Sequence, residues 1–349
     1  MSNNGMQTAL PQIKALRALL EQFSKANTKT ATRQLIVALL FYFAGWAAMY
    51  YSLRISYWLT LLLAFPTVGF LMRIFIFFHD CGHNSFFPST RMNRLIGFWL
   101  GVLVFTPGEQ WWHAHAIHHA TNGNLDRRGV GDVPTLTIEE YQKLSPGGRL
   151  GYRLFRHPLI MFGLGPIWMF LIQHRWPSPR FGKKETMSVV WANLAILAIA
   201  AGLGWSIGFS NYVLIQLPLL WMAGMAGIWM FYIQHQFVTV YWARDSQWNF
   251  LASALQGASC YRLPKVLEWV SGNIGYHHIH HLNPLVPNYQ LARAYQSAEV
   301  LRQAPTLNIR QSLNCIPLAL IDEKAGKMVS FRQAWASMHC DETGQGVQV

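Results

Sequence analysis

The sequence predicts an all-α integral membrane protein, with four transmembrane helices in two hairpins, interfacial helices, and a cytosolic helical cap that carries a histidine-rich metal site. Three observations support this prediction. Charged residues make up only 12% of the chain and aromatic residues 14%, whereas about a quarter of a soluble domain is charged. Several segments are apolar over the length of a membrane crossing. Most of the 14 histidines fall in three short groups outside those segments.

A helix needs roughly 20 mostly apolar residues to cross a hydrocarbon core of about 30 Å. The segments that meet this requirement are residues 35–51, 58–78, 189–209 and 212–233. Short turns, around Arg54 in the first pair and at Ser210 and Asn211 in the second, predict two tight hairpins. The apolar runs at residues 95–105 and 159–172 are shorter. We expect them to lie in the membrane interface rather than to cross it.

The distribution of basic residues predicts the orientation in the membrane. The hairpin turns carry only Arg54, whereas the amino-terminal arm carries Lys14, Arg17, Lys25, Lys29 and Arg33. By the positive-inside rule, the arm (1–34), the cap (79–188 and 234–300) and the tail (301–349) are expected to be cytosolic. Residues 35–300 then form the membrane domain. Arg73, near the cytosolic end of a span, is expected to extend to the lipid headgroups.

The remaining composition excludes other classes. The four cysteines form no CxxC pair, which supports neither a disulfide framework nor a thiolate zinc site and fits a reducing, cytosol-facing environment. The net charge of +13 is not arranged as a nucleic-acid-binding pattern. A sided membrane protein accounts for it, and we expect no nucleic-acid partner.

The histidine groups have the spacing of metal ligands. HxxxH follows the second span, and HxxHH occurs once in the centre of the chain and once near its carboxyl end; these groups contain His79, His83, His115, His118, His119, His277, His280 and His281. Residues i, i+3 and i+4 share one helix face, so each HxxHH is expected to present three imidazoles to a common point. His235 ends the fourth span as His79 ends the second, and it is a candidate ninth ligand.

The number of imidazoles indicates how many metal ions the site can bind. Zinc closes its coordination with four ligands, whereas eight or nine imidazoles suffice for two metals with positions left open. Imidazole suits iron, copper, zinc and nickel, so ligand type alone does not select among them. A site at the membrane face gives an apolar substrate access from lipid and electrons access from the cytosol, which favours a redox metal that uses O₂.

Two other classes remain as alternatives. His79 to His83 has the spacing of the HExxH zinc proteases, but Asp80 stands where their glutamate would be and the histidines are too many. A membrane metal transporter should carry polar residues along its spans, and these spans have almost none.

At these residues the chain resembles the membrane fatty acid desaturases, and more closely their acyl-lipid Δ12 (omega-6) type. The resemblance covers about residues 35–300 and is carried by residues 79–87 (HDCGHNSFF), 115–120 (HAIHHA), 123–129 (GNLDRRG) and 275–282 (GYHHIHHL). It implies a helical membrane fold and two non-haem iron ions held by the nine histidines named above. It also implies an O₂-dependent reaction that puts a cis double bond into an acyl chain. The related hydroxylases and ketolases share these ligands.

Residues around the predicted ligands have secondary candidate roles. Asp80 and Asp126 are candidates to orient imidazoles, although a helix cap or pairing with Arg127 and Arg128 is an equal alternative. His113 and His278 fall at variable positions of their motifs and are candidate pocket residues behind the ligands. Trp111 and Trp112 are candidates to line a bent, apolar substrate tunnel, or to anchor the chain at the interface.

The expected partners follow from the same reasoning. They are an acyl lipid or other fatty acyl substrate, O₂, membrane lipid, and an external electron donor such as ferredoxin or a cytochrome b5-type protein. The donor must be a separate protein because the chain carries no haem or flavin motif. The basic cytosolic surface would suit an acidic donor.

Overall fold

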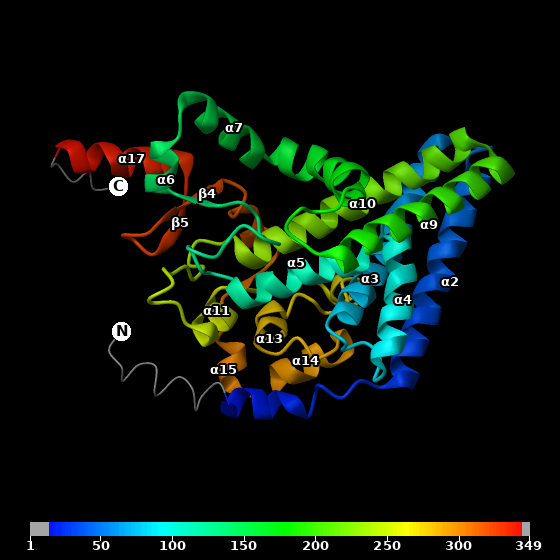
Figure 1. Ribbon diagram of the computed structural model, residues 1–349, viewed down its shortest axis with the longest axis horizontal. Coiled ribbons are helices and arrows are strands. Elements are labelled where there is room, and N and C mark those ends of the chain that lie inside the picture. Colours follow the sequence, from blue (N-terminus) through cyan, green and yellow to red (C-terminus); the bar gives the residue numbers. More distant parts are fainter. Residues whose placement is uncertain (1–13, 344–349) are drawn as a thin grey trace.

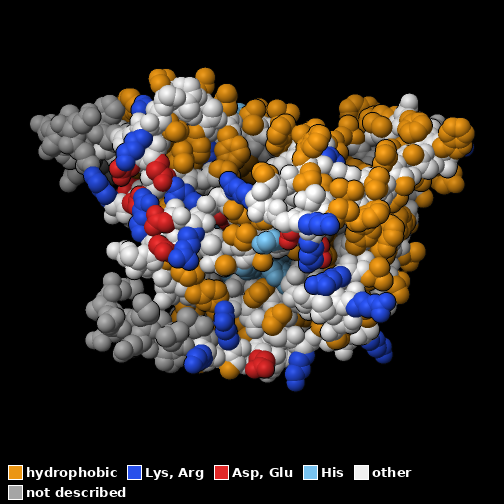
Figure 2. Space-filling model, viewed as in Figure 1, with side chains coloured by type: hydrophobic (Ala, Val, Ile, Leu, Met, Phe, Trp, Pro, Cys, Tyr) orange, Lys and Arg blue, Asp and Glu red, His pale blue; other side chains and the backbone are white. Residues whose placement is uncertain are grey.

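Four long apolar helices dominate the computed structural model, which describes residues 14–343. Each is long and apolar enough to cross a membrane: α2 (Thr28–Ser52), α3 (Tyr57–Gly82), α9 (Lys183–Ile207) and α10 (Phe209–His235). α2 packs against α3, α3 against α10 and α10 against α9 (Figure 1). Hydrophobic side chains cover the side of the molecule formed by these helices, and most charged side chains lie elsewhere (Figure 2). The predicted four spans in two hairpins are confirmed.

The ends of the spans differ from the prediction for local reasons. α2 begins seven residues early, because the Asn27 side chain accepts a hydrogen bond from the backbone N–H of Thr30 and caps the helix there. The second hairpin turns at Gly208, not at Ser210 and Asn211. Gly208 has a φ of 91°, a conformation that glycine adopts without steric cost.

The two short apolar runs fold differently from each other. Residues 95–105 fall largely within α4 (Thr90–Leu103). Residues 159–172 form a helix with π-helical turns, built from η1 (Leu159–Leu164), α8 (Gly165–Ile167), η2 (Trp168–Ile172) and η3 (Gln173–Arg175). It meets α7 (Pro146–Arg156) at a 62° bend, and the bent pair has the length and composition of a broken span or re-entrant loop. The bend follows from Pro158, which keeps His157 out of the helical region.

The cap is mostly helical. Its central part holds α5 (Gly108–Thr121) and α6 (Ile138–Lys143), and its carboxyl-terminal part holds α11 (Phe250–Gln256), α12 (Lys265–Val270), α13 (His277–Leu282) and α14 (Asn288–Gln296). α15 (Glu299–Arg302) crosses into the tail, which holds α16 (Ile309–Leu313) and α17 (Phe331–Thr343). Residues 14–21 form a further helix, which buries Leu20 against Ile279 and Leu282 of α13. The first thirteen residues of the predicted arm and the last six of the tail lie outside the described residues.

Five short strands were not predicted. β1 (Leu136–Thr137), β4 (Leu318–Asp322) and β5 (Lys327–Ser330) form one sheet, and β2 (Cys260–Tyr261) pairs with β3 (Thr306–Leu307). β1 pairs with β4 in parallel, with Leu136 opposite Leu320. Strands of two residues carry no alternation that a sequence pattern can reveal. The domain boundary at residue 300 remains a prediction, and the β1–β4 and β2–β3 pairs cross it.

Arg73 does not extend to the lipid headgroups as expected. Its side chain is 4% exposed and donates a hydrogen bond to the carbonyl oxygen of Trp269 in α12. The guanidinium carbon lies 4.1 Å from the centroid of the Trp269 ring, at cation–π distance. The physical reason is that α12 packs on α3 and supplies the polar partner that a headgroup would otherwise give.

Close packing of α10 against α8 makes a first test of the fold. A Cβ atom at Gly224 would lie 2.8 Å from Cβ of Pro166 and 2.9 Å from Cε2 of Phe170. We expect Gly224→Ala to destabilise the protein by about 1 to 3 kcal/mol through overpacking, seen as a lower melting temperature in detergent. Gly202→Ala on α9 is the control, because nothing lies within 4 Å of its added Cβ; it should be neutral or stabilising. Equal melting temperatures for the two variants would contradict the packing described.

Candidate metal centre

The nine candidate ligands come from four helices that end or cross at one place. α3 and α10 deliver His79 and His235 at their carboxyl ends, where the helix dipole favours a cation. α5 carries the central HxxHH group and α13 the last one. Residues about 200 positions apart in sequence are thereby brought into contact, as the 3.0 Å separation of the His79 and His280 Nε2 atoms shows.

The histidines form two clusters, with the ligand nitrogens of each cluster within 4.8 Å of one another. One cluster consists of His79, His83, His115, His119 and His280, and the other of His118, His235, His277 and His281. All nine residues that the sequence predicted are present, and these clusters contain no other residue. The arrangement has the ligand number expected for two metal ions.

The clusters do not follow the sequence motifs. His115 and His119 lie in one cluster and His118 in the other, and His277 and His281 are likewise separated from His280. The expectation that each HxxHH presents three imidazoles to a common point is therefore wrong. Successive residues on a helix point about 100° apart, so His118 and His119 diverge enough to reach different metal positions.

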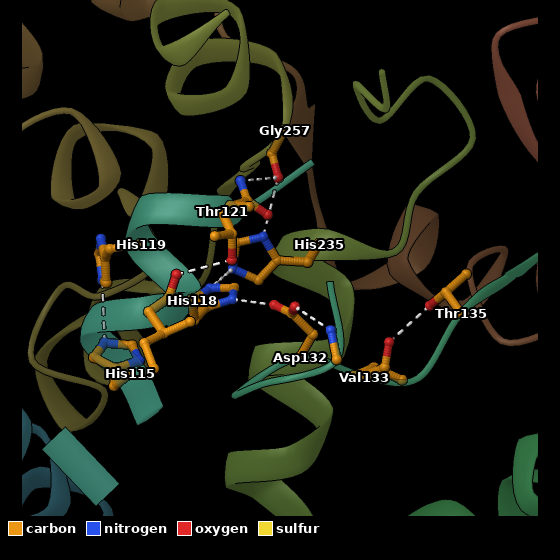
Figure 3. A network of polar contacts seen from close by, with 12 residues as sticks. His115, His118, His119, Thr121, Asp132, Val133, Thr135, His235 and Gly257 are labelled. Carbon is orange, nitrogen blue, oxygen red and sulfur yellow. Dashed lines mark hydrogen bonds and ion pairs between the residues drawn. The ribbon is translucent and has the colours of Figure 1, made fainter. Parts of the chain in front are cut away.

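The protonation pattern tests whether a metal fits. The Nδ1–H of His79 donates to Asp80 at 3.0 Å, and that of His235 donates to the carbonyl oxygen of Gly257 at 3.0 Å. Nδ1–H of His118 donates to Asp132 (Figure 3). In a neutral imidazole the other nitrogen, Nε2, then carries a lone pair.

These lone pairs face one another. The Nε2 atoms of His118 and His235 are 3.2 Å apart, and those of His235 and His277 are 2.9 Å apart. Nε2 of His83 is buried without a hydrogen-bond partner among the described residues. Lone pairs that converge in this way repel unless a cation lies between them. The donor set therefore fits metal ions bound through Nε2.

Burial keeps the imidazoles neutral. Desolvation, reinforced by neighbouring imidazoles, lowers the pKa well below its usual range for His83, His115, His119, His277, His280 and His281. Neutral imidazole is the form that binds a metal. At neutral pH these groups need not lose a proton before they coordinate.

An apolar cavity of about 650 Å³ reaches the five-histidine cluster at His115. Its wall comes largely from α3, α10 and the segment 159–175, and its lining also includes Trp111 and Asp132. The volume is within the roughly 300 to 1,000 Å³ of small-molecule sites, which are mostly apolar. The cavity therefore links the membrane-spanning helices α3 and α10 to the candidate ligand His115.

The two tryptophans have different environments. Trp111 lines the cavity and stacks on the His115 ring, with centroids 4.6 Å apart. Trp112 is not among the residues that line it; its indole Nε1–H donates to the carbonyl oxygen of Phe78 at 3.0 Å, and its ring fills the space beside Gly82 and Gly97. A lining role for Trp112 is contradicted, because the next residue on a helix turns away by about 100°.

Of the residues proposed to support the ligands, Asp80 contacts one. Its Oδ1 accepts from His79, and its Oδ2 accepts from the backbone N–H and the side-chain amide of Asn288 at 2.8 and 2.9 Å. The carboxylate is 2% exposed. Asp80 therefore ties α3 to α14 and fixes the orientation of one imidazole.

The other candidates lie elsewhere. Asp126 accepts hydrogen bonds from Arg244 and from the backbone N–H of Asp245, not from an imidazole, Arg127 or Arg128. His113 is exposed and pairs with Glu185 at 2.9 Å. His278 is buried but turns from the clusters, with its Nε2–H donating to the carbonyl oxygen of Leu301. Motif positions placed His113 and His278 beside candidate ligands, and helix geometry directs them away. Asp126 lies in the loop after α5.

Asp132 is the supporting residue that the sequence did not reveal. It lies 14 positions after His118, too far for any helical spacing to connect them. The loop between them turns back at Gly129 and Gly131, with φ of 104° and 74°. A Cβ at Gly131 would lie 2.6 Å from the carbonyl oxygen of Ala114, so the loop approaches α5 only with glycine there. The pair of glycines is the one local signal of this turn.

Comparisons with known proteins agree with this geometry. The family model described as "Fatty acid desaturase" matches residues 55–311, which is most of the chain. The chain belongs to the fatty acid desaturase family. A fatty acid desaturase of Bacillus subtilis is 44% identical over 326 residues, covering 93% of each chain. The chloroplastic omega-6 fatty acid desaturase of Spinacia oleracea is 25% identical over 292 residues, covering 79% of this chain and 63% of the relative.

A third relative bears on the reaction. The sn-1 acyl-lipid omega-3 desaturase (ferredoxin) of Synechocystis is 28% identical over 237 residues, covering 64% of this chain and 63% of the relative. The predicted desaturase resemblance is confirmed, including its likeness to an omega-6 enzyme. The chain is therefore an oxidoreductase that desaturates fatty acyl chains. These relatives favour that reaction over the hydroxylase, protease and transporter alternatives.

Proposed function

We propose that the two histidine clusters hold two iron ions, and that the chain places a cis double bond in the acyl chain of a membrane lipid. The observation that carries the proposal is the pair of largely buried clusters, of five and four imidazoles, one of which contributes His115 to the wall of an apolar cavity. Bound iron would supply the O₂-dependent oxidation that removes two hydrogens from neighbouring carbons.

The chain's own residues bind and orient. Leu71, Phe75 and Phe231 line the apolar route from the spans, and Trp111 forms a wall where the route reaches His115. This surface can hold an acyl chain while excluding water from the reacting carbons. Asp80, Asp132 and the Gly257 carbonyl keep the protons of three imidazoles on Nδ1, so that their Nε2 atoms stay directed at the metal positions.

We further propose that both termini and the metal centre are on the cytosolic side, since the arm is basic and the hairpin turns are nearly uncharged. Electrons would come from a separate protein such as ferredoxin or a cytochrome b5-type carrier. Imidazole side chains are visible near the middle of the face in Figure 2, with basic and acidic side chains beside them. The net charge of +13 would suit an acidic donor.

The test is expression of the full chain in a host without desaturases, with purification in detergent. We expect about two irons per chain, one for each cluster, and new cis double bonds in the lipid-bound fatty acids that require O₂. Metal analysis and chromatography of fatty acid derivatives make the two measurements. Tightly held zinc, or hydroxylated chains in place of alkenes, would overturn the proposal.

A further inference from the structure

Two residues from different spans meet part-way along the cavity. Gly227 of α10 and Met72 of α3 both line it. A Cβ atom added at Gly227 would lie 3.9 Å from Cε and 4.0 Å from Sδ of Met72, with no other atom within 4 Å. The thioether of Met72 therefore lies over a stretch of backbone that carries no side chain.

The pair lies on the membrane side of the metal centre. Met72 precedes His79 by seven residues on α3, and Gly227 precedes His235 by eight on α10. At 1.5 Å per residue, both are roughly 10 to 12 Å along their helices from the ligands. Phe75 and Phe231 line the cavity between the pair and the ligands, and Leu220 lines it about two turns beyond.

Beyond the pair, the part of the wall that α3 and α10 form is apolar, and the cavity lining also includes Gln173 and His174 of η3. The residues of α3 and α10 that line this part are Leu71, Leu220, Ala223 and Gly224. A methyl end of an acyl chain fits such a wall, whereas an ester or carboxyl group would lose its hydrogen bonds there. An acyl segment that extends past the reacting carbons along this α3 and α10 wall would therefore pass Met72 and Gly227.

We infer that Gly227 and Met72 form the neck of the acyl cavity and determine how many carbons lie between the reacting carbons and the methyl end. This inference rests on the proposed desaturase function. Met72 has three flexible side-chain torsions and can move as a chain passes. Because Gly227 has no side chain, displacement of the Met72 side chain alone would open the neck to a chain, whereas an added Cβ at Gly227 would already touch Met72.

A larger side chain at Gly227 should shorten the accepted segment. We expect Gly227→Leu to reduce the wild-type product about tenfold or more, since one methylene too many in an apolar pocket has an effect of this size. The remaining products should carry fewer carbons between the double bond and the methyl end. Met72→Phe, which narrows the neck from the opposite wall, should shift the products in the same direction.

The decisive experiment compares these variants in the desaturase-free host, with double-bond positions determined by mass spectrometry. Met72→Ala combined with Gly227→Leu should restore the wild-type product, because it returns space to the neck. Gly202→Leu is the matched control. Gly202 is exposed on α9, and a Cβ atom added there would have nothing within 4 Å, so the products of this variant should be those of the wild type.

A binding measurement makes the test independent of turnover. In purified protein, saturated lysophospholipids of increasing chain length should raise the melting temperature, and the longest chain that does so should be shorter for Gly227→Leu than for the wild type. The proposed neck would be contradicted if Gly227→Leu and Met72→Phe gave the wild-type products and the wild-type dependence of melting temperature on lysophospholipid chain length. An inactive Gly227→Leu that Met72→Ala does not restore would also overturn it. Absence of unsaturated product from the wild type would instead overturn the proposed function.

Discussion

Replacement of His280 by Ala should abolish the unsaturated product and reduce the iron content of the purified protein. His280 is buried, and its Nε2 lies 3.0 Å from that of His79 in the five-histidine cluster. Loss of a direct ligand should lower activity by more than the roughly 100-fold seen when an outer partner of a ligand is lost. Fatty acid analysis and iron determination on the same preparation measure the effect.

The matched control is His113→Ala. His113 lies on α5, which carries three of the candidate ligands, but it is exposed and pairs with Glu185. The product yield and iron content of His113→Ala should therefore equal those of the wild type. Both variants should be compared at equal protein abundance and with their melting temperatures recorded. Full activity in His280→Ala would remove that residue from the proposed ligand set.

Replacement of Asp132 by Asn is the second change with a large expected effect. The Asp132 carboxylate accepts the Nδ1 proton of His118, which is 1% exposed. An amide can present its NH₂ group to Nδ1 and thereby favour the tautomer whose lone pair points away from the metal. Loss of such an outer partner typically lowers metal affinity or activity 10- to 100-fold.

If Asp132 had a purely structural role, its replacement would lower the melting temperature without a selective change in the rate of iron release. We therefore expect Asp132→Asn to release iron faster from one of two sites, while the melting temperature of the metal-free protein stays within a few degrees of the wild type. Asp126→Asn is the control, because Asp126 lies in an exposed ion pair with Arg244. Equal iron release in the two variants would contradict the assignment.

The sequence by itself predicted the elements whose signal is local. Four apolar runs predict four spans because lipid leaves a helix as the main way to satisfy backbone hydrogen bonds. The i, i+4 pairs His79–His83, His115–His119 and His277–His281 each lie within one cluster, as one helix face requires. His235 was predicted from its place at the end of a span and lies in the four-histidine cluster. Local spacing and position thus named the nine candidate ligands that the two clusters contain.

Only the tertiary structure decided how those ligands are divided and supported. His118 and His280 each lie in a different cluster from the other histidines of their motif, because α5 and α13 each supply residues to both clusters. Asp132 reaches His118 through a glycine turn, and Gly227 meets Met72 from another span. These contacts join residues separated by many positions. Their free energies depend on which helices pack together, and no periodicity within a single helix encodes that.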